Sequence, residues 1–310
     1  MSAFDQAGEL LGGDRFVIQR RLGAGGMGVV YQALDTERNQ VVALKTLRDL
    51  DAGGLARFKN EFRSLADFTH PNLVTLYELI SAADRLMFTM ELVDGQGFLR
   101  HVRSDRRIAR SDPGQAPTDE PSRTQVTAVG KRAPSSDPGV ARVSDVSPGR
   151  IDALDVPRLR SVLVQLARGV LALHEAGMLH RDLKPSNVLV TPSGVLKILD
   201  FGLVTVLPRE RTRRSETGLA GTVAYMSPEQ GARLPLTQAS DWYAVGVMLY
   251  EALTGALPFS GAPPDILVEK QQYEPAPPHA RVAGVPSDLD ALCVELLRRD
   301  PAARPSGHDI

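Results

Sequence analysis

The chain carries the sequence HRDLKPSN at residues 180–187 and, one short apolar stretch later, DFG at residues 200–202. Together the two motifs supply two carboxylates, a cation and an amide, which are Asp182, Asp200, Lys184 and Asn187. Carboxylate and amide oxygens are hard ligands that suit Mg²⁺. A cation beside a carboxylate balances phosphate charge while a hydroxyl is positioned for attack. The combination therefore indicates phosphoryl transfer, which neither motif would indicate alone.

In this wording the motifs resemble the catalytic loop and the metal-binding loop of eukaryotic-like protein kinases, here of the bacterial serine/threonine type. The resemblance implies transfer of the γ-phosphoryl group of Mg-ATP to protein serine and threonine hydroxyls, so ATP and Mg²⁺ are the expected cofactors. It implies that Asp182 orients the hydroxyl and accepts its proton, and that Lys184 offsets charge on the γ-phosphate. It also implies that Asn187 and Asp200 bind Mg²⁺.

The same resemblance implies an α+β fold with two lobes. The first lobe would hold a small antiparallel sheet and one key helix, and the second would be larger and mostly helical. We expect a single kinase domain over residues 1–310, with the small lobe and hinge at 14–93 and the large lobe at 94–310. Because the sequence stops inside what would be the last helix of such a domain, we expect it to be part of a longer protein.

A glycine-rich loop is predicted at residues 23–28, between strands predicted at 16–22 and 29–34. A β-branched strand, not a helix, follows the glycines, which favours a kinase phosphate-binding loop over a dinucleotide-binding fold. Glycine allows backbone N–H groups to lie close to phosphate oxygens. The ATP-binding residues that the resemblance implies are Leu22, Gly23, Ala24, Gly25, Gly26, Gly28, Val30, Ala43, Lys45, Met90, Glu91, Val93 and Leu189.

A lysine and a glutamate are expected to form an ion pair in the small lobe. Lys45 ends an apolar strand predicted at 41–45, on the same face as Ala43, because side chains alternate along a strand. Glu61 lies at the edge of the apolar face of a helix predicted from about residue 55 to 65. A half-buried carboxylate is costly unless it is paired. The two charges therefore explain one another as the kinase lysine–glutamate pair, with Lys45 holding the α- and β-phosphates. Two solvated surface charges are the alternative.

The remaining ATP-binding residues belong to the predicted hinge. Strands are predicted at 74–79 and 86–90, and residues 91–93 follow them. The resemblance implies that backbone groups of this hinge receive the adenine edge. It places Met90 at the back of the pocket and Ala43 above the ring.

The composition changes abruptly at residues 104–152, which are rich in Pro, Ser, Gly, Arg and Asp and show no periodicity. Such a stretch cannot bury enough apolar surface to offset the entropy of ordering. We therefore expect a disordered insertion, which serves either as a phosphorylated or partner-binding segment or as a passive surface loop.

Two helices are expected to support the catalytic loop. The first runs from Asp155 to Gly177 and leads straight into the loop, which gives Asp182 a rigid support. The second begins near Asp241 and is apolar on nearly all sides, so it is predicted to be buried. A buried Asp241 should accept hydrogen bonds from the backbone of the catalytic loop.

A short hairpin is predicted after the catalytic loop, with strands at 188–190 and 196–199. Asn187 and Asp200 stand at its two ends, so they are expected to lie close enough to share a metal ion.

Residues 200–229 match a kinase activation segment. The motifs Gly221-Thr222 and Ser227-Pro228-Glu229 stand where the family places its substrate-docking loop. Serine replaces the usual alanine of Ala-Pro-Glu, and Arg304 resembles the arginine that pairs with Glu229. Thr222 resembles a threonine that hydrogen-bonds near the catalytic aspartate.

Arg181, beside the catalytic aspartate, implies regulation by phosphorylation of the activation segment. Ser215 and Thr217 are the favoured sites, and Thr205 and Thr212 are weaker ones. The alternative is that these are ordinary loop residues.

Composition excludes several other classes of protein. A formal net charge of −1 argues against binding nucleic acid or anionic membranes by bulk electrostatics. The single cysteine, Cys293, lies in an apolar helical pattern, so it is expected in the core and allows no disulfide within the chain. Residues 242–259 are apolar but interrupted by Glu251, which favours a buried helix over a membrane span. A cytoplasmic protein is expected, with no signal peptide and no membrane segment.

Two other functions remain open. A kinase fold that has lost catalysis could act as a scaffold, although the presence of Lys45, Glu61, Asp182, Asn187 and Asp200 argues against it. A small-molecule phosphotransferase could share the fold, but it would not need the polypeptide-docking motifs. The expected partners are therefore protein substrates, with self-association for autophosphorylation between copies.

Overall fold

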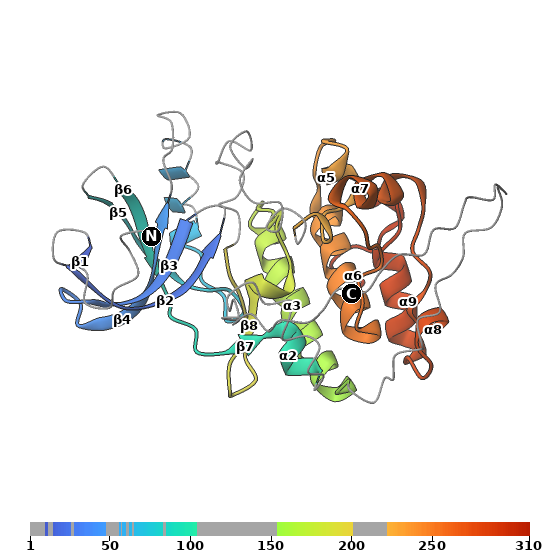
Figure 1. Cartoon of the computed structure of the whole chain (residues 1–310), viewed down its shortest axis with the longest axis horizontal. Coiled ribbons are helices and arrows are strands. Elements are labelled where there is room, and N and C mark those ends of the chain that lie inside the picture. The colour runs from blue at the N-terminus through green and yellow to red at the C-terminus, as the bar shows by residue number, and fades with distance from the viewer. Residues whose placement is uncertain are drawn as a thin grey trace, which may run out of the picture.

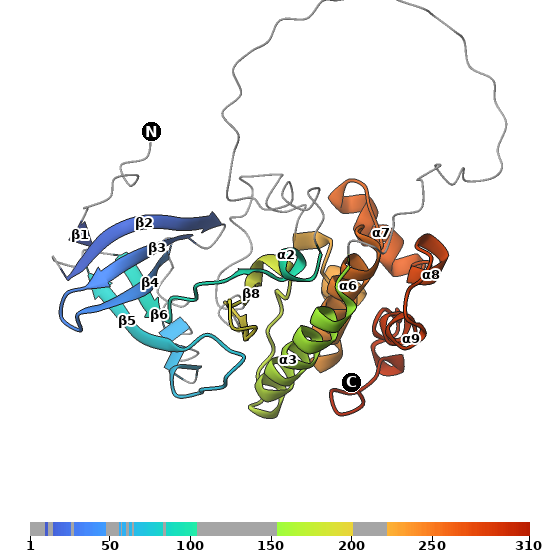
Figure 2. The same cartoon turned by 90° about the horizontal axis from the view of Figure 1, so that it is seen from below.

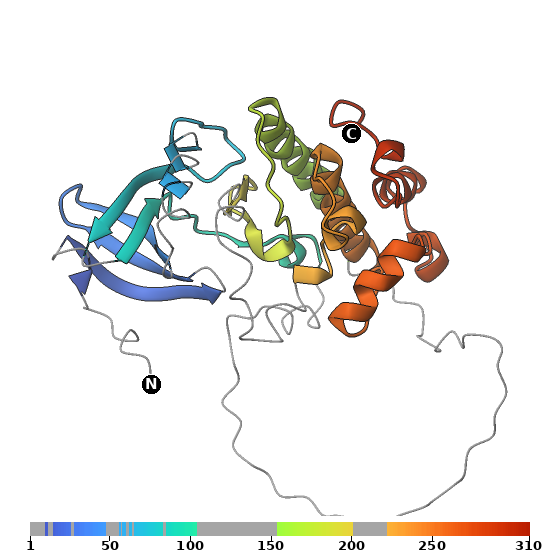
Figure 3. The same cartoon turned by 90° about the horizontal axis from the view of Figure 1, so that it is seen from above.

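The structure is a computed structural model that describes residues 10–11, 15–25, 28–47, 56, 58–59, 62–63, 65–82, 85–103, 154–200 and 222–310. Most strands lie at one end of the molecule and most helices at the other (Figure 1), and the turned views in Figure 2 and Figure 3 show the same separation. The elements are β1 (Leu10–Leu11), β2 (Phe16–Gly25), β3 (Gly28–Asp35), β4 (Gln40–Leu47), β5 (Leu76–Ala82), β6 (Arg85–Met90), β7 (Gln96–Gly97), α2 (Phe98–Val102), α3 (Val156–Glu175), η3 (Pro185–Asn187), β8 (Val188–Val190), β9 (Leu196–Ile198), α5 (Pro228–Gly231), α6 (Gln238–Thr254), α7 (Pro263–Gln272), α8 (Pro278–Arg281), α9 (Ser287–Leu296) and η6 (Pro301–Ala303).

The small lobe contains an antiparallel sheet in the order β1-β2-β3-β4-β6-β5. The strands that the sequence predicts are confirmed in β2, β3, β4 and β6. β5 begins at Leu76, whereas the sequence predicted a strand from Val74. The backbone N–H of Val74 donates instead to the carbonyl of Ile198 at 2.9 Å, because this part of the chain passes to the large lobe.

Side chains alternate between the two faces of the sheet, as the strand period requires. One face buries a cluster with Phe16, Val42 and Leu44, and the other buries Ala43 and Leu47 with Phe58, Phe62 and Phe88. The described residues between 56 and 66 are helical, as predicted, and Phe62 from that helix lies with its ring centroid 5.6 Å from that of Phe88.

The glycine-rich segment forms the end of a hairpin and not the longer loop that the sequence predicted. Strand pairing continues to Gly25 opposite Gly28, so the predicted loop over residues 23–28 is too long. Glycine can follow the irregular register between Arg21 and Gly23 because it has no Cβ atom. At Gly28, where φ is 149°, an added Cβ would lie 1.7 Å from the carbonyl oxygen of Thr46. Gly28 is therefore required by its neighbour as well as by its backbone angle.

The long helix of the large lobe is confirmed as α3. The side chain of Asp155 accepts a hydrogen bond from the N–H of Arg158 and caps the first turn, and Gly177 beyond the last turn has φ 75°. The predicted insertion at 104–152 lies outside the described residues.

The predicted buried helix is confirmed as α6. Its side chains are buried on nearly all sides, including Trp242 and Tyr250, and it lies beside α3 (Figure 2). The hydroxyl of Tyr225 donates to the carboxylate of Glu251, which explains the acidic residue in this helix. Cys293 on α9 is fully buried, as predicted, and donates to the carbonyl of Gly246. Within the described part of the chain, no helix is long and apolar enough to cross a membrane.

Candidate active site

The catalytic loop, residues 180–187, brings three of the predicted site residues into one hydrogen-bonded group. The Nζ of Lys184 donates to Oδ2 of Asp182 at 2.8 Å and to Oγ1 of Thr222 at 3.3 Å. The Nδ2 of Asn187 donates to the backbone oxygen of Asp182 at 2.8 Å and to its Oδ2 at 3.2 Å. The predicted placement of Thr222 beside this group is confirmed.

Asp241 accepts hydrogen bonds from the backbone of the catalytic loop, as predicted. Its two carboxylate oxygens accept hydrogen bonds from the N–H groups of His180 at 2.8 Å and Arg181 at 2.7 Å. Arg181 has a positive φ of 66°, a conformation that costs roughly 1–3 kcal/mol for a residue other than glycine. The surrounding contacts therefore have to maintain a strained backbone directly before Asp182.

Two contacts that support the loop, one to Arg181 and one to Asp241, were not predicted from the sequence. The side chain of Gln230 donates to the carbonyl of Arg181 at 2.8 Å, which fixes the other side of that strained residue. The Nε2 of His174 lies 2.9 Å from the carboxylate of Asp241. His174 could have been found from its position on the apolar face of α3, whereas Gln230 gives no comparable signal.

The predicted hairpin is confirmed as β8 and β9, and it brings the two proposed metal ligands together. The N–H of Leu199 donates to the carbonyl of Asn187 at 2.8 Å and so closes the hairpin beside Asp200. Since Nδ2 of Asn187 donates to Asp182, the amide oxygen Oδ1 is the atom of this side chain that could serve as a metal ligand. An amide oxygen and a carboxylate are suitable ligands for Mg²⁺, which commonly takes one or two protein ligands plus phosphate oxygens. In the described part of the chain, no three His, Cys, Asp or Glu side chains form a larger metal-binding group.

Asp200 also contacts Lys45, at the end of the small-lobe sheet. The Nζ of Lys45 lies 2.7 Å from Oδ1 of Asp200, and Asp200 has a positive φ of 56°. Lys45 is only 5% exposed, so its charge needs such a partner. The predicted pairing of Lys45 with Glu61 stays a prediction, because Glu61 lies outside the described residues.

Most of the residues predicted to bind ATP lie on adjacent strands of the small lobe and on the hinge. β4 and β6 place Ala43 opposite Met90, and β3 places Val30 opposite Lys45. Leu189 is half buried on β8, between buried neighbours. The other predicted residues on β2 and β3 are Leu22, Gly23, Ala24, Gly25 and Gly28, and Gly26 lies outside the described residues.

The hinge leaves backbone groups that could meet a purine edge. The N–H of Glu91 donates to the carbonyl of Thr75 at 2.8 Å, and its side chain lies 2.9 Å from Nζ of Lys197. Among the described residues, neither the Glu91 carbonyl nor the Val93 N–H makes a backbone hydrogen bond. These two groups have the polarity that a hinge contact to adenine would need.

The predicted ion pair at the end of the activation segment is confirmed. The Nη1 and Nη2 of Arg304 donate to the two carboxylate oxygens of Glu229 at 2.7 and 2.9 Å, and Ser240 donates to the same carboxylate. Burial raises the pKa of Glu229, but the hydrogen bonds from Arg304, from the backbone and from Ser240 together outweigh burial and hold this pKa below its usual value. Ser227, the unusual serine, caps α5 by accepting a hydrogen bond from the N–H of Gln230. The neighbouring Gly221 and the predicted phosphorylation sites Ser215, Thr217, Thr205 and Thr212 lie outside the described residues.

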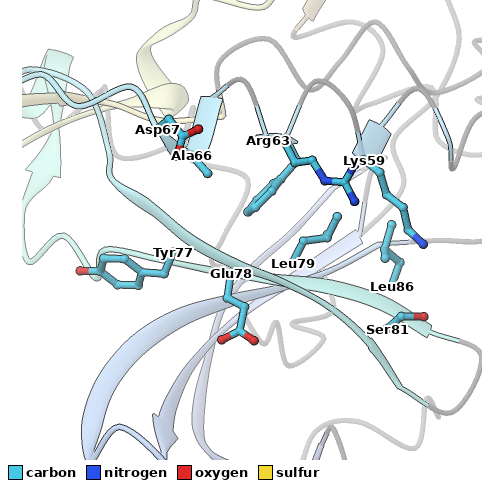
Figure 4. Close-up of a pocket in the computed structure, with 10 residues that line it drawn as sticks. Lys59, Arg63, Ala66, Asp67, Tyr77, Glu78, Leu79, Ser81 and Leu86 are labelled. Atoms are coloured by element: carbon cyan, nitrogen blue, oxygen red, sulfur yellow. The ribbon is translucent and has the colours of Figure 1, made fainter.

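A cavity of about 410 Å³ lies elsewhere on the small lobe, between the helical residues 59, 62, 63 and 66 and the strands β5 and β6 (Figure 4). Its wall combines cationic, acidic and apolar side chains, among them Lys59, Arg63, Glu78 and Leu79. None of its lining residues belongs to the catalytic loop or the hinge, so it is separate from the candidate active site.

The chain resembles known protein kinases over almost its whole length. Residues 16–310 match the family described as "Protein tyrosine and serine/threonine kinase". The chain is 31% identical to the "Probable serine/threonine-protein kinase PknB" of Bifidobacterium longum, over 94% of this chain and 37% of that protein. It is 32% identical to "Serine/threonine-protein kinase pkn2" of Myxococcus xanthus, over 96% of this chain and 31% of that protein.

A third relative is "Serine/threonine-protein kinase PknB" of Mycobacterium tuberculosis, which is 29% identical over 94% of this chain and 41% of that protein. The chain thus spans well under half the length of each of these curated relatives.

Proposed function

Because the chain belongs to the protein tyrosine and serine/threonine kinase family, we propose that it transfers the γ-phosphoryl group of Mg-ATP to serine and threonine hydroxyls of proteins. The observation that carries this proposal is the hydrogen-bonded group of Asp182, Lys184, Asn187 and Thr222. It places a carboxylate that can accept a proton beside a cation that can offset phosphate charge. The names of the relatives support serine and threonine as the acceptors.

Asp182 would accept the proton of the substrate hydroxyl, and Lys184 would stabilise charge on the transferred phosphoryl group. Lys184 is well placed for this role because its Nζ already lies between Asp182 and Thr222. Lys45 would hold the α- and β-phosphates, with Glu61 as its predicted partner. The presence of all these groups counts against the scaffold alternative.

Asn187 and Asp200 would hold Mg²⁺, which when bound would neutralise phosphate charge and orient the γ-phosphate. The adenine ring would lie between the small-lobe strands and β8, in contact with Ala43, Met90 and Leu189. The Glu91 carbonyl and the Val93 N–H would pair with its edge. The glycines of the β2–β3 hairpin would cover the phosphates.

The domain division is also a proposal. The small lobe and hinge would extend over 14–93, the large lobe over 94–310, and the insertion over 104–152. The use of ATP is consistent with a cytoplasmic domain. Since the relatives are longer than this chain, the activity proposed here is that of the kinase domain.

We extend the proposal to autophosphorylation of the activation segment, with Ser215 and Thr217 as the sites. A phosphate there would form charge-assisted hydrogen bonds with Arg181. Replacing both residues with alanine should lower turnover markedly, measured after the protein has been incubated with Mg-ATP. Unchanged turnover in the double variant would rule out this form of regulation.

The main proposal is tested by the chemistry of the phosphorylated product. The chain is incubated with Mg-ATP and a basic protein that contains serine, threonine and tyrosine, and the modified residues are mapped by mass spectrometry. We expect phosphoserine and phosphothreonine, and we expect neither in a Lys45→Met variant. Phosphotyrosine alone, or phosphorylation of small molecules but of no protein, would contradict the proposal.

A further inference from the structure

Lys270 is a buried lysine outside the residues assigned to the active site. It lies on α7, one turn after the buried Ile266, and only 1% of it is exposed. Its Nζ donates to three backbone carbonyls, those of Val223 at 3.2 Å, Ala224 at 2.6 Å and Met226 at 2.7 Å. An ammonium group has three N–H donors. The site therefore satisfies each donor of the buried charge with one carbonyl.

These carbonyls belong to residues 222–226, which we call the docking segment. Its first residue, Thr222, accepts a hydrogen bond from Lys184, and Lys184 also donates to Asp182. A continuous set of contacts therefore leads from Lys270 through Val223 and Thr222 to the proposed catalytic residues. A shift of the docking segment would move Thr222 relative to Asp182.

Other contacts show that the docking segment is held in one conformation. Val223 is buried in an apolar cluster with Phe259 and Ile266, and the hydroxyl of Tyr225 donates to Glu251. The ring centroid of Tyr243 lies 5.3 Å from Nζ of Lys270, a favourable position for an aromatic ring beside a cation. The helix α7, which carries Lys270, also contacts α5, the helix that follows the docking segment (Figure 1). Lys270 therefore links α7 to the docking segment beside an existing contact between α7 and α5.

We propose that Lys270 is a positioning residue for protein substrates, which fixes the docking segment beside Asp182 by holding three of its carbonyls. The inference rests on the proposed kinase function. Among the described residues, the hydrogen bonds and the ring contact of Lys270 are to residues 223, 224, 226 and 243, none of which is assigned to ATP or Mg²⁺. Its loss should therefore impair the use of a protein substrate more than the binding or hydrolysis of ATP.

The test compares Lys270→Met, Lys270→Arg and Gln272→Met with the wild-type chain. Methionine removes the donors at similar length, whereas arginine keeps a charge and several donors. Gln272 is exposed on the last turn of the same helix and serves as the control. Each variant is assayed for KM and kcat with a basic protein substrate, for hydrolysis of Mg-ATP without that substrate, and for ATP affinity.

We expect Lys270→Met to reduce kcat/KM for the protein by about tenfold or more, as misplacement of a docked substrate would do. ATP affinity and hydrolysis should change little, Lys270→Arg should recover part of the loss, and Gln272→Met should behave as wild type. Loss of protein phosphorylation and ATP hydrolysis in the same proportion would contradict a positioning role, as would unchanged kinetics in Lys270→Met.

Hydrogen exchange of the backbone amides in the docking segment is measured on the same samples. Faster exchange there in Lys270→Met, with unchanged protection of α6, would support the positioning role even if no phosphate were transferred. Unchanged exchange would overturn it. The absence of transfer by the wild-type chain would instead refute the proposed kinase function, so the two failures are distinguishable.

Discussion

The ammonium of Lys45 lies 2.7 Å from a carboxylate oxygen of Asp200, and the contact joins the small-lobe sheet to the end of the hairpin that follows the catalytic loop. In the proposed function, Lys45 holds ATP phosphates and Asp200 holds Mg²⁺. Both ligands would therefore meet charges that already neutralise one another. Mg-ATP should bind by rearranging this ion pair and not by filling a site that is ready for it.

Asp200→Asn should lower kcat for protein phosphorylation by about 10²–10³, the effect of removing one well-placed electrostatic group. It should also remove most of the dependence of ATP affinity on Mg²⁺, because the amide is a weaker ligand than the carboxylate. ATP affinity is measured with and without Mg²⁺, and Asp67→Asn on the exposed surface serves as the control. A variant that keeps the full Mg²⁺ dependence would show that Asp200 does not bind the metal.

Asp241→Asn should destabilise the catalytic loop. The amide offers one oxygen where the carboxylate offers two, so one of the N–H groups of His180 and Arg181 loses its acceptor. We expect the free energy of unfolding to fall by about 1–3 kcal/mol, and kcat to fall by about tenfold to a hundredfold because Asp182 is displaced. Urea unfolding and steady-state kinetics measure the two effects. The control is Asp265→Asn on the exposed surface, which should behave as wild type. If Asp241→Asn also behaved as wild type, its role in supporting the catalytic loop would be disproved.

Arg304→Met should cost about 3–5 kcal/mol of unfolding free energy at pH 7, because it leaves the Glu229 carboxylate buried without its counter-charge. The pKa of Glu229 is lowered in the folded protein, so the stabilisation by the pair is present above the usual glutamate value and is lost as pH falls through the folded pKa. The difference between variant and wild type should therefore shrink in acid.

The control for this experiment is Arg298→Met. Arg298 pairs with Glu274 at 3.0 Å on the surface, where both side chains are more than 40% exposed. Its loss should cost less than about 1 kcal/mol. Urea unfolding measures the loss of unfolding free energy in both variants. If Arg298→Met and Arg304→Met lost the same amount, burial would not explain the contribution of the Arg304–Glu229 pair.

Protein phosphorylation should weaken as pH rises through about 7, the value to which burial lowers the pKa of Lys270. A base is charged below its pKa, so the three hydrogen bonds to the docking segment are complete at lower pH, and one donor is lost above it. The ring of Tyr243, whose pKa is raised by burial, lies beside Lys270, and Arg304, which is paired with Glu229, lies over the same ring.

The measurement is the KM for the protein substrate in wild type and in Lys270→Arg. It covers about pH 6 to 9, a range that spans the change of charge of Lys270. We expect a rise in KM with pH in the wild type and a flatter profile with arginine, which does not titrate there. Identical profiles for the two proteins would exclude Lys270 as the titrating group.

The sequence predicts those contacts in which a charge stands in an apolar setting. Asp241 in an apolar helix requires buried partners, and the structure gives it the predicted ones. The pairing of Glu229 with Arg304 was predicted from the resemblance to the kinase family, and the structure confirms it. Regular periodicity predicts α3 and the strands of the small lobe, and an apolar stretch without periodicity predicts α6 as a buried helix. These features depend on local pattern, which a single sequence displays.

Contacts that depend on the position of one element relative to another are less accessible to prediction. The pairing of Lys45 with Asp200 is decided by how the two lobes meet, and no periodic pattern expresses that arrangement. Lys270 is satisfied by carbonyls, which every residue has, so nothing in the sequence identifies its partners. The start of β5 at Leu76 also depends on such a contact, because the N–H of Val74 donates to the carbonyl of Ile198 in the large lobe. The sequence pattern does not show this contact.

In the proposed function, Asp182 accepts the proton of the protein hydroxyl during phosphoryl transfer from ATP. The most direct test is transfer of labelled γ-phosphate from Mg-ATP to a basic protein, in the wild type and in Asp182→Asn, with ATP affinity measured for both. We predict that the variant keeps its ATP affinity and its fold but loses transfer by about 10²–10⁴, the usual contribution of a general base. If the variant transferred phosphate as fast as the wild type, or if the wild type bound ATP but transferred no phosphate, this role of Asp182 would be contradicted.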